Sequence, residues 1–197
     1  EAAFAFFRGE NNIATYSRLG NPSTAFLAQK IAELEVCSLE EEVEARGLLF
    51  ASGMAAISSA LLSQLKAGDV VLTQSVLYGT SSDLIKTNLS DLGIQVLTND
   101  FKDPEEIRKI LRSQPTIKVF YLETPINPTL ACIDLKSICA IAQEYEVKTI
   151  VDNTFSTSYI QQPFKFGADI VVYSSTKFMN GHGTGISGAA VTRTVED

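Results

Sequence analysis

The chain has 197 residues, of which 45% are apolar and 20% are charged. This composition is typical of a globular domain with a sizeable buried core, and the length suits one domain with at most a small appendage. The 16 basic and 23 acidic residues give a net charge of −7, which argues against nucleic acid as a partner. The sequence holds no apolar run near the ~20 residues that span a bilayer and no signal-peptide pattern, so we expect a cytoplasmic protein without a membrane segment.

The cysteines and the single histidine indicate reduced thiols and no metal site. Cys37, Cys132 and Cys139 form neither an even disulfide set nor a closely spaced pair, and His182 is the only histidine. The chain opens with Glu1 rather than Met and stops directly after a predicted strand. We therefore expect a fragment of a longer protein.

Residues 1–44 are interpreted as a polar arm followed by a helix. An Asn21-Pro22 turn precedes apolar residues at helical spacing as far as Leu39. Residues 45–197 are interpreted as a second unit, in which short apolar runs alternate with amphipathic segments. Its predicted strands are 47–51, 69–73, 94–97, 117–122, 147–152, 169–174 and 187–192, and its predicted helices are 54–65, 81–91, 103–112 and 135–145.

This alternation predicts an α/β fold with a mostly parallel sheet and helices on both faces. Strands of four to six residues separated by helices are what a parallel sheet requires, because parallel neighbours need a crossover connection. The helix signals agree: Asp103 is a capping residue, Pro104 suits the first turn, and Glu106 lies three residues after the cap. Ligands bind such sheets at the carboxyl ends of the strands, so the polar residues there are the candidate site.

Two predicted strands are followed by groups suited to an anion and to a cation. After strand 47–51, Ser52 and Gly53 open a helix whose free N–H groups can hold a phosphate, although an ordinary helix cap has the same sequence. Asp152 ends strand 147–152, and a carboxylate there needs a partner. A protonated heterocyclic nitrogen would be one, and a helix cap or a buried salt bridge is the common alternative.

Two further strand ends carry hydroxyls, an amine and an aromatic ring. After strand 169–174, Ser174 and Thr176 can bind phosphate oxygens, and Lys177 can form a Schiff base with an aldehyde. Tyr78 follows strand 69–73 and can stack on a planar ring. Taken alone, Lys177 would be a surface lysine and Tyr78 a half-buried packing residue.

Together these residues predict pyridoxal phosphate as the cofactor, because that molecule needs all of them at once. Its aldehyde needs an amine, its ring nitrogen a carboxylate, its phosphate a helix start with hydroxyls, and its ring face an aromatic side chain. A carboxylate keeps the pyridine nitrogen protonated, so that the ring accepts electrons from the α-carbon of the substrate.

The sequence also resembles the Cys/Met-metabolism pyridoxal-phosphate enzymes. This family includes cystathionine synthases and lyases, methionine γ-lyase and O-acetylhomoserine sulfhydrylase. The resemblance follows the family's order over almost the whole chain. The segments that carry it are YSRLGNPSTAFLAQKIAELE at 16–35, FASGMAAI at 50–57, LYGTSSDL at 77–84, ETPINPTL at 123–130, VDNTFSTSYIQQPFKFGADIVVYSSTKFMNGHG at 151–183 and SGAAV at 187–191.

The resemblance implies a role for each candidate residue. Lys177 would hold the cofactor aldehyde and move protons, Asp152 would pair with the ring nitrogen, and Tyr78 would stack on the ring and act as an acid or base near the leaving group. Asn127 would lie beside the ring. The phosphate would be held by Gly53, Met54, Ser174 and Thr176 of the same subunit and by Tyr16 and Arg18 of a neighbouring subunit.

The resemblance further implies a homo-oligomer, expected to be a tetramer built from dimers with shared sites, in which segment 1–44 contacts the neighbouring subunit. Its fold would be the large domain of the fold-type I enzymes, without the C-terminal small domain whose arginine binds the substrate carboxylate. The GHG-Thr form at 181–184 is more similar to the sulfhydrylase branch than to several lyases. His182 there is interpreted as structural.

The expected reaction is γ-elimination or γ-replacement on a sulfur-containing amino acid or an activated homoserine. One alternative is a fragment that binds pyridoxal phosphate or a partner without turnover, since a fold does not fix a function. A remote alternative is a dinucleotide-binding oxidoreductase, because Gly183–Gly188 satisfies G-x-G-x-x-G. The context disfavours it, since a predicted strand rather than a helix follows the glycines.

Overall fold

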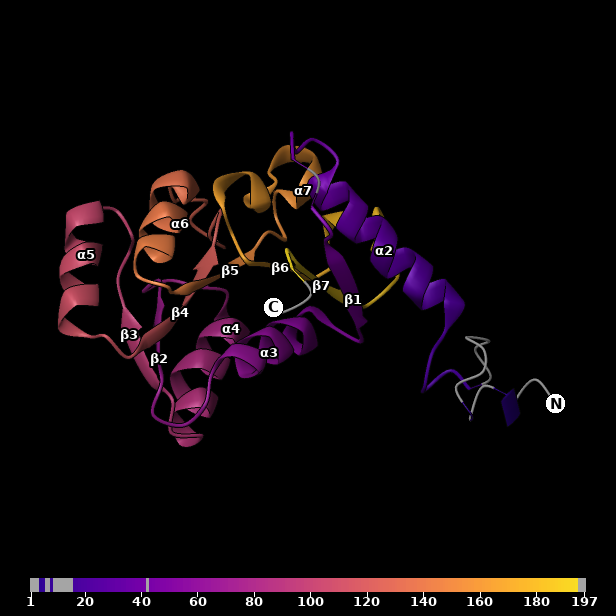
Figure 1. The fold of residues 1–197 in the computed structure, drawn as a ribbon, viewed down its shortest axis with the longest axis horizontal. Helices are drawn as coiled ribbons and strands as arrows, with labels where there is room; N and C mark the ends of the chain where they lie inside the picture. Colours follow the sequence, from indigo (N-terminus) through magenta and orange to yellow (C-terminus); the bar gives the residue numbers. More distant parts are fainter. Residues whose placement is uncertain (1–3, 6–7, 9–15, 42, 195–197) are drawn as a thin grey trace.

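The computed structural model describes residues 4–5, 8, 16–41 and 43–194, and these form a three-layer α/β structure around a twisted sheet (Figure 1). The sheet has seven strands in this part of the chain. In spatial order they are β1 (Arg46–Phe50), β7 (Gly188–Thr192), β6 (Ile170–Tyr173), β5 (Lys148–Asp152), β4 (Ile117–Glu123), β2 (Val70–Thr73) and β3 (Gln95–Thr98).

The sheet is mostly parallel, as the sequence predicts. Strands β3, β2, β4, β5 and β6 run parallel, and each neighbouring pair is matched over three to five residue pairs. The register of β2 with β4 shifts between Val70 and Val71. Strand β7 is antiparallel to both β6 and β1. The β6–β7 connection contains the 3₁₀ turn η3 (Phe178–Asn180) and no α-helix, which is the usual means of bringing the chain back for a parallel strand.

Helices cover both faces of the sheet, which confirms the predicted fold class. One face packs against α2 (Pro22–Val36), α5 (Pro104–Ser113) and α6 (Leu135–Glu144). The other packs against α3 (Gly53–Gln64), α4 (Gly79–Asp83) and the π-helical η1 (Leu84–Leu89) (Figure 1). Alternate strand residues serve the two cores: Phe120 and Leu122 face the first, and Val119 and Tyr121 face the second.

The helix starts largely follow the sequence signals, with two corrections. Asp103 caps α5, and its Oδ1 accepts from the Glu105 backbone N–H at 2.9 Å. The Asn21-Pro22 dipeptide is the start of α2 rather than a separate turn, because Asn21 caps that helix. The apolar spacing predicts too long a helix here, because α2 ends at Val36 and Leu39 lies in the turn that follows.

The helix predicted at 81–91 begins earlier, at Gly79, and changes from α4 to η1 at Leu84. The segment that leads to Pro163 forms the short helix α7 (Thr157–Ile160), and η2 (Pro163–Phe166) follows it. Among the described residues, no helix combines the length and apolarity that crossing a bilayer needs.

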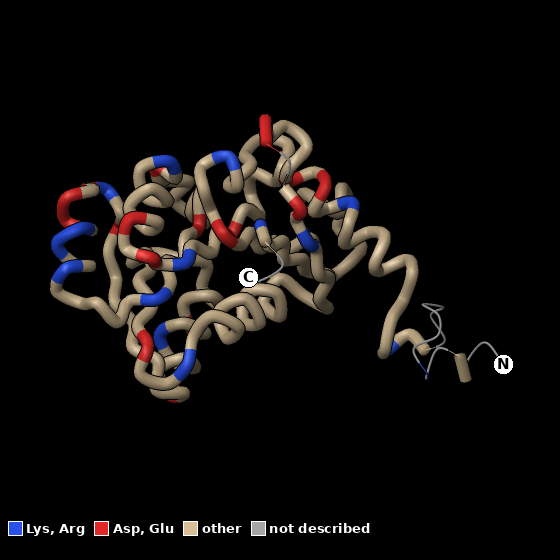
Figure 2. The backbone as a smooth tube through the Cα atoms, in the orientation of Figure 1, with Lys and Arg blue, Asp and Glu red and all other residues tan. Residues whose placement is uncertain are grey.

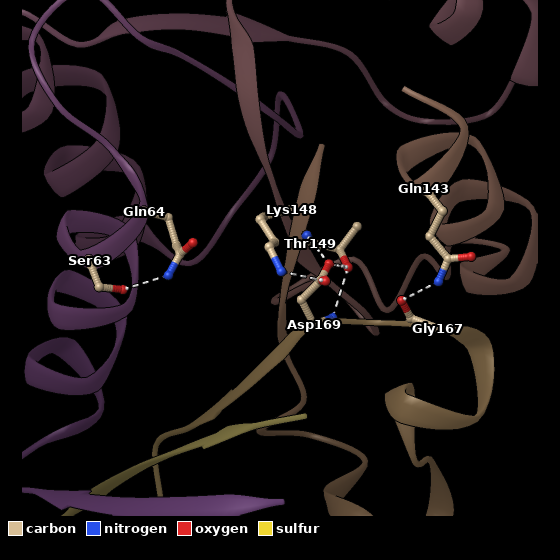
Figure 3. Close-up of polar contacts among 7 residues, drawn as sticks. All are labelled: Ser63, Gln64, Gln143, Lys148, Thr149, Gly167 and Asp169. Atoms are coloured by element: carbon tan, nitrogen blue, oxygen red, sulfur yellow. Dashed lines mark hydrogen bonds and ion pairs between the residues drawn. The ribbon is translucent and has the colours of Figure 1, made fainter. Parts of the chain in front are cut away.

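A polar cluster ties β5 to β6 at their amino ends, away from the candidate site. The Asp169 carboxylate accepts from Lys148 Nζ at 3.2 Å, from the Thr149 backbone N–H at 2.8 Å and from Thr149 Oγ1 at 2.9 Å (Figure 3). Nearby, Gln143 Nε2 donates to the Gly167 carbonyl at 3.1 Å. These contacts hold the two strands in register at the edge opposite their carboxyl ends.

Glu35 is an acidic residue in the core, on the face of α2 that packs against the sheet. Its side chain is completely buried. Burial raises the pKa of Glu35 from 4.5 to about 8, while the Asn153 side chain acts in the opposite direction. At neutral pH the folded protein therefore holds Glu35 as the neutral acid, whereas the unfolded chain ionises it.

We predict that Glu35 makes the fold less stable as the pH rises. The pKa of Glu35 is raised on folding. Its contribution to the free energy of unfolding is therefore fully present below pH 4.5 and is lost as the pH rises through about 8. Within that window, the ionisation of Glu35 in the unfolded chain lowers the free energy of unfolding by about 1.4 kcal/mol for each pH unit. Urea denaturation of the wild type and of Glu35→Gln from pH 5 to 9 measures the difference.

The exposed Glu33, on the same helix, supplies the matched control variant Glu33→Gln. The wild type should lose stability relative to Glu35→Gln as the pH rises, and Glu33→Gln should follow the wild type. Parallel curves for all three proteins would contradict the prediction.

Candidate active site

The amino end of α3 lies at the carboxyl edge of the sheet and carries an uncompensated positive dipole. Ser52 caps the helix, and its Oγ accepts from the Ala55 backbone N–H at 3.1 Å. The first turn of α3 holds no acidic residue, and the whole helix carries no charge (Figure 2). The free N–H groups of such a helix start attract an anion.

Two glycines allow α3 to pack directly on the ends of β6 and β7. A Cβ atom at Gly53 would lie 2.5 Å from Ser174 Cβ and 2.8 Å from Ser174 Oγ. A Cβ atom at Gly188 would overlap the Ser52 carbonyl. The structure thus brings the two predicted phosphate-binding residues Gly53 and Ser174 into contact, in a space that only glycine permits.

Asp152 lies at the carboxyl end of β5, buried and held by two hydroxyl-bearing side chains. Its Oδ1 accepts from the Thr154 backbone N–H at 3.0 Å and from Thr154 Oγ1 at 2.6 Å, and its Oδ2 accepts from Tyr121 Oη at 3.3 Å. Burial raises the pKa of Asp152, and the Thr154 hydrogen bonds oppose that shift. A cation beside this carboxylate would favour its ionised form.

Thr154 joins Asp152 to the neighbouring strand end. Besides donating to Asp152, its hydroxyl accepts from the Ser174 backbone N–H at 2.8 Å. The sequence reasoning missed Thr154, although it stands only two residues after Asp152. The available signal was a hydroxyl in the loop directly after the predicted carboxylate.

Tyr78 and Asn127 come from different loops and share one anchor, Glu123 at the end of β4. Glu123 Oε2 accepts from the Tyr78 backbone N–H, and Oε1 accepts from the Asn127 backbone N–H, both at 2.8 Å. The Tyr78 side chain is half-exposed. Glu123 was not predicted as a site residue, although the rule that selected Asp152, a carboxylate at the end of an apolar strand, applies to it equally.

Lys177 is exposed and follows the β6 strand end. Its backbone N–H donates to the Ser174 carbonyl at 3.0 Å, and η3 begins at the next residue. The neighbouring Thr176 hydroxyl donates to the Ser187 carbonyl and accepts from the Ser187 N–H, each at 3.0 Å. To donate to a phosphate, Thr176 would have to release the Ser187 carbonyl, which the Thr176 backbone N–H also contacts.

The remaining predicted residues divide between the site and the arm. Met54, on the first turn of α3, accepts a weak hydrogen bond from Ser81 of α4 at 3.8 Å. The Arg18 guanidinium lies 5.0 Å from the centre of the Tyr16 ring, and both side chains are exposed. They precede α2, at the end of that helix that projects away from the sheet (Figure 1). The structure does not bring them to the site of their own chain.

These residues fit pyridoxal phosphate. The uncompensated start of α3 beside Ser174 suits a phosphate, and the buried carboxylate of Asp152 suits a protonated ring nitrogen. Lys177 offers an exposed amine in the loop after β6, the strand that pairs with the β5 strand of Asp152. The cofactor predicted from the sequence therefore meets matching groups along one edge of the sheet.

Comparison with known proteins identifies the family of the chain. The family model described as Cys/Met metabolism PLP-dependent enzyme matches residues 1–197. The chain belongs to this family. Pyridoxal phosphate is the family's cofactor, as the sequence predicts.

Relatives and solved structures support the assignment. The chain is 46% identical to an L-methionine gamma-lyase of Fusobacterium nucleatum over 90% of this chain and 43% of that protein. It is 40% identical to the cystathionine beta-lyase MetC of Staphylococcus haemolyticus, over 93% of this chain and 44% of that protein. The chain spans less than half the length of these relatives.

A solved structure of similar fold is a putative O-acetylhomoserine (thiol)-lyase of Campylobacter jejuni, which contains a pyridoxyl-lysine monophosphate group. It is 34% identical, with a TM-score of 0.85 over 98% of this chain and 46% of that one. The cystathionine gamma-lyase of Lactobacillus plantarum, complexed with L-serine, is 36% identical, with a TM-score of 0.84 over 93% of this chain and 46% of that one.

The dinucleotide-binding alternative finds no support in the fold. Strand β7 begins at Gly188, the last glycine of the G-x-G-x-x-G match, so no helix follows the glycines. A dinucleotide site would need a helix there to receive the pyrophosphate.

We predict that Thr154→Val weakens both the fold and cofactor binding. Valine keeps the shape but removes the donor to Asp152 and the acceptor for the Ser174 N–H, so the unfolding free energy should fall by about 1–3 kcal/mol. Pyridoxal phosphate should bind less tightly because the Asp152 carboxylate loses a hydrogen bond that favours its ionised form. Urea denaturation and a spectroscopic titration measure the two effects. Thr154→Ser, which keeps the hydroxyl, should stay near the wild type in both, and equal losses in the serine and valine variants would refute the role of the hydroxyl.

Proposed function

We propose that this chain is the cofactor-binding part of an enzyme that carries out γ-elimination or γ-replacement on sulfur-containing amino acids or O-acylhomoserines. The observation that carries the proposal is the meeting of a helix start, a buried carboxylate and a lysine at one sheet edge. Gly53 contacts Ser174, Thr154 links Ser174 to Asp152, and Lys177 follows on the same loop. The identity to an L-methionine gamma-lyase supports this reaction class.

In this proposal each residue has one binding role. The Lys177 amine holds the aldehyde, the Asp152 carboxylate holds the ring nitrogen, and Tyr78 stacks on the ring with Asn127 beside it. The first N–H groups of α3, at Gly53 and Met54, hold the phosphate with the Ser174 and Thr176 hydroxyls. When bound, pyridoxal phosphate supplies an electron sink for the pair of electrons released at the substrate α-carbon.

The side chains of the protein move the protons. When it is free of the aldehyde, the Lys177 amine could accept the α-proton of the substrate, pass it to another group and then accept a β-proton. Removal of the β-proton leaves at the β-carbon the electron pair that expels the γ-group. The Tyr78 hydroxyl, half-exposed at the start of α4, can donate a proton to the departing γ-group. Asp152 stays ionised beside the protonated ring nitrogen and so keeps the electron sink effective.

The identity to a cystathionine beta-lyase makes β-elimination a second candidate for the same site. A protein that binds the cofactor without turnover is the non-catalytic alternative. The products distinguish these outcomes. Formation of 2-oxobutanoate from methionine indicates γ-elimination, and formation of pyruvate from cystathionine indicates β-elimination. Consumption of O-acetylhomoserine only when sulfide is added indicates γ-replacement.

We further propose a homo-oligomer, a tetramer built from dimers, in the cytoplasm. Segment 1–44 would place Tyr16 and Arg18 at the phosphate of a neighbouring subunit's site, and residues 45–197 would form the cofactor-binding unit. The support is the segment that holds Tyr16 and Arg18, which leads into α2 at the end of that helix that projects away from the sheet (Figure 1). The free thiols of Cys37, Cys132 and Cys139 suit a reducing compartment.

We predict that Lys177 carries the cofactor covalently. Titration with pyridoxal phosphate, borohydride reduction and peptide mass analysis should place a pyridoxyl group on the peptide that contains Lys177. Lys177→Ala should lose the adduct and at least a thousand-fold of any turnover, whereas the exposed Lys102→Ala should keep both. Full turnover in Lys177→Ala, or an adduct on another lysine of the wild type, would overturn the assignment.

We predict that inactive variants of two residues restore each other's activity when mixed. If Arg18 serves a neighbouring subunit, a dimer of Lys177→Ala and Arg18→Ala has one doubly altered site and one intact site. Random re-association should then recover about a quarter of the wild-type activity. Co-refolding the two variants and assaying the mixture tests this, and activity no higher than the average of the two variants alone would place Arg18 at the site of its own chain.

A further inference from the structure

The Glu123 carboxylate divides its two oxygens between two loops. Oε2 accepts from the Tyr78 backbone N–H, in the loop that leads into α4, and Oε1 accepts from the Asn127 backbone N–H, in the loop after β4. Both distances are 2.8 Å. One side chain therefore sets the separation of two loops that lie 45 and 4 residues from it in the chain.

The backbone of Glu123 is itself held firmly. The Gln74 side chain, at the end of β2, donates from Nε2 to the Glu123 carbonyl at 2.9 Å and accepts from the Glu123 N–H through Oε1 at 2.6 Å. Gln74 and Glu123 are both buried. The Gln74 side chain takes the place of a strand partner on the β2 side, and Asp152 of β5 is paired with Glu123 on the other side. The carboxylate therefore projects from a fixed point at the edge of the sheet.

Burying a carboxylate here is unfavourable unless its hydrogen bonds compensate. Burial raises the pKa of Glu123, and the charge of Asp152 adds to that rise, whereas the N–H groups of Tyr78 and Asn127 lower it. A carboxylate at this position therefore has an electrostatic cost that the two backbone hydrogen bonds must offset.

We propose that Glu123 is a positioning residue that clamps the Tyr78 and Asn127 loops on the bound pyridoxal phosphate ring. This inference rests on the proposed function, because it takes the stacking role of Tyr78 and the place of Asn127 beside the ring from it. The clamp sets the tilt and height of the Tyr78 ring over the cofactor. Glu123 acts through these two loops and touches no reacting atom.

The clamp requires a carboxylate of this length. Glutamine keeps the size of Glu123 but has only one acceptor oxygen, and its NH₂ group would face one of the two backbone N–H donors. Aspartate keeps both acceptors but is one methylene shorter, so it cannot span both loops without moving them. Glu123→Gln should therefore free one loop, and Glu123→Asp should strain both.

The experiment combines amide exchange with cofactor binding. In the cofactor-free wild type, hydrogen exchange should be slow at both the Tyr78 and the Asn127 amides, and Glu123→Gln should speed exchange at one of them. On titration with pyridoxal phosphate, the variant should bind roughly ten-fold more weakly. Its visible circular dichroism should change sign or strength, because the ring sits at a different tilt beside Tyr78.

Asp169→Asn is the matched control. Asp169 holds β5 to β6 at the amino edge of the sheet, so its variant lowers stability without touching the clamp. It should leave the exchange of the Tyr78 and Asn127 amides, the cofactor affinity and the circular dichroism at wild-type values. A general loosening of the fold would instead move these quantities in both variants.

The outcomes separate the clamp from the proposed function. If the wild type binds no pyridoxal phosphate on Lys177, the proposed function fails, and the positioning role fails with it. If the wild type binds and Glu123→Gln matches it in affinity and circular dichroism, the clamp is refuted while the proposed function stands. Should Glu123→Gln not fold, unprotected Tyr78 and Asn127 amides in the wild type would refute the clamp, and affinity loss in Glu123→Asp with wild-type stability would support it.

Discussion

The contact between the start of α3 and the ends of β6 and β7 is the constraint on which the site depends. Gly53 lies against Ser174 and Gly188 lies against the Ser52 carbonyl, with no space for a Cβ atom at either glycine. This close contact places the positive end of an uncharged helix beside the Ser174 hydroxyl. Ser174 in turn precedes Lys177 by three residues in the chain. A larger residue at either glycine would separate the start of α3, which we propose holds the phosphate, from Lys177.

From this contact, hydrogen bonds extend across the sheet edge to the groups that we propose face the ring. Thr154 connects Ser174 to Asp152, Tyr121 donates to Asp152 from β4, and Glu123 at the end of β4 holds the Tyr78 and Asn127 loops. Burial raises the pKa of both carboxylates, so each depends on its donors for ionisation. A protonated ring nitrogen beside Asp152 would supply the missing positive charge, which explains why an edge with two buried acids suits this cofactor.

Much of the architecture was predictable because its signals are local. Alternating apolar and amphipathic runs predict the strands and helices, and the Asp103 cap marks a helix start that the structure confirms. The polar residues after the strands located Asp152 and Lys177 at one edge, since parallel strands bring their carboxyl ends together. The predicted end of α2 was wrong because the apolar spacing continues to Leu39, beyond the last helical residue.

By itself, the sequence determined the fold class, through the periodicity of its side chains, and the family, through the motifs that it shares with other members. Residue types at strand ends indicated the residues suited to pyridoxal phosphate. Only the tertiary structure showed that Glu123 joins Tyr78 to Asn127, that Thr154 joins Asp152 to Ser174, and that Glu35 is a buried acid. These pairings join segments that are far apart in the chain, and Glu35 is a common type of helix residue that packing happens to bury. No local pattern encodes them, since they depend on how the strands align and on which atoms the packing removes from water.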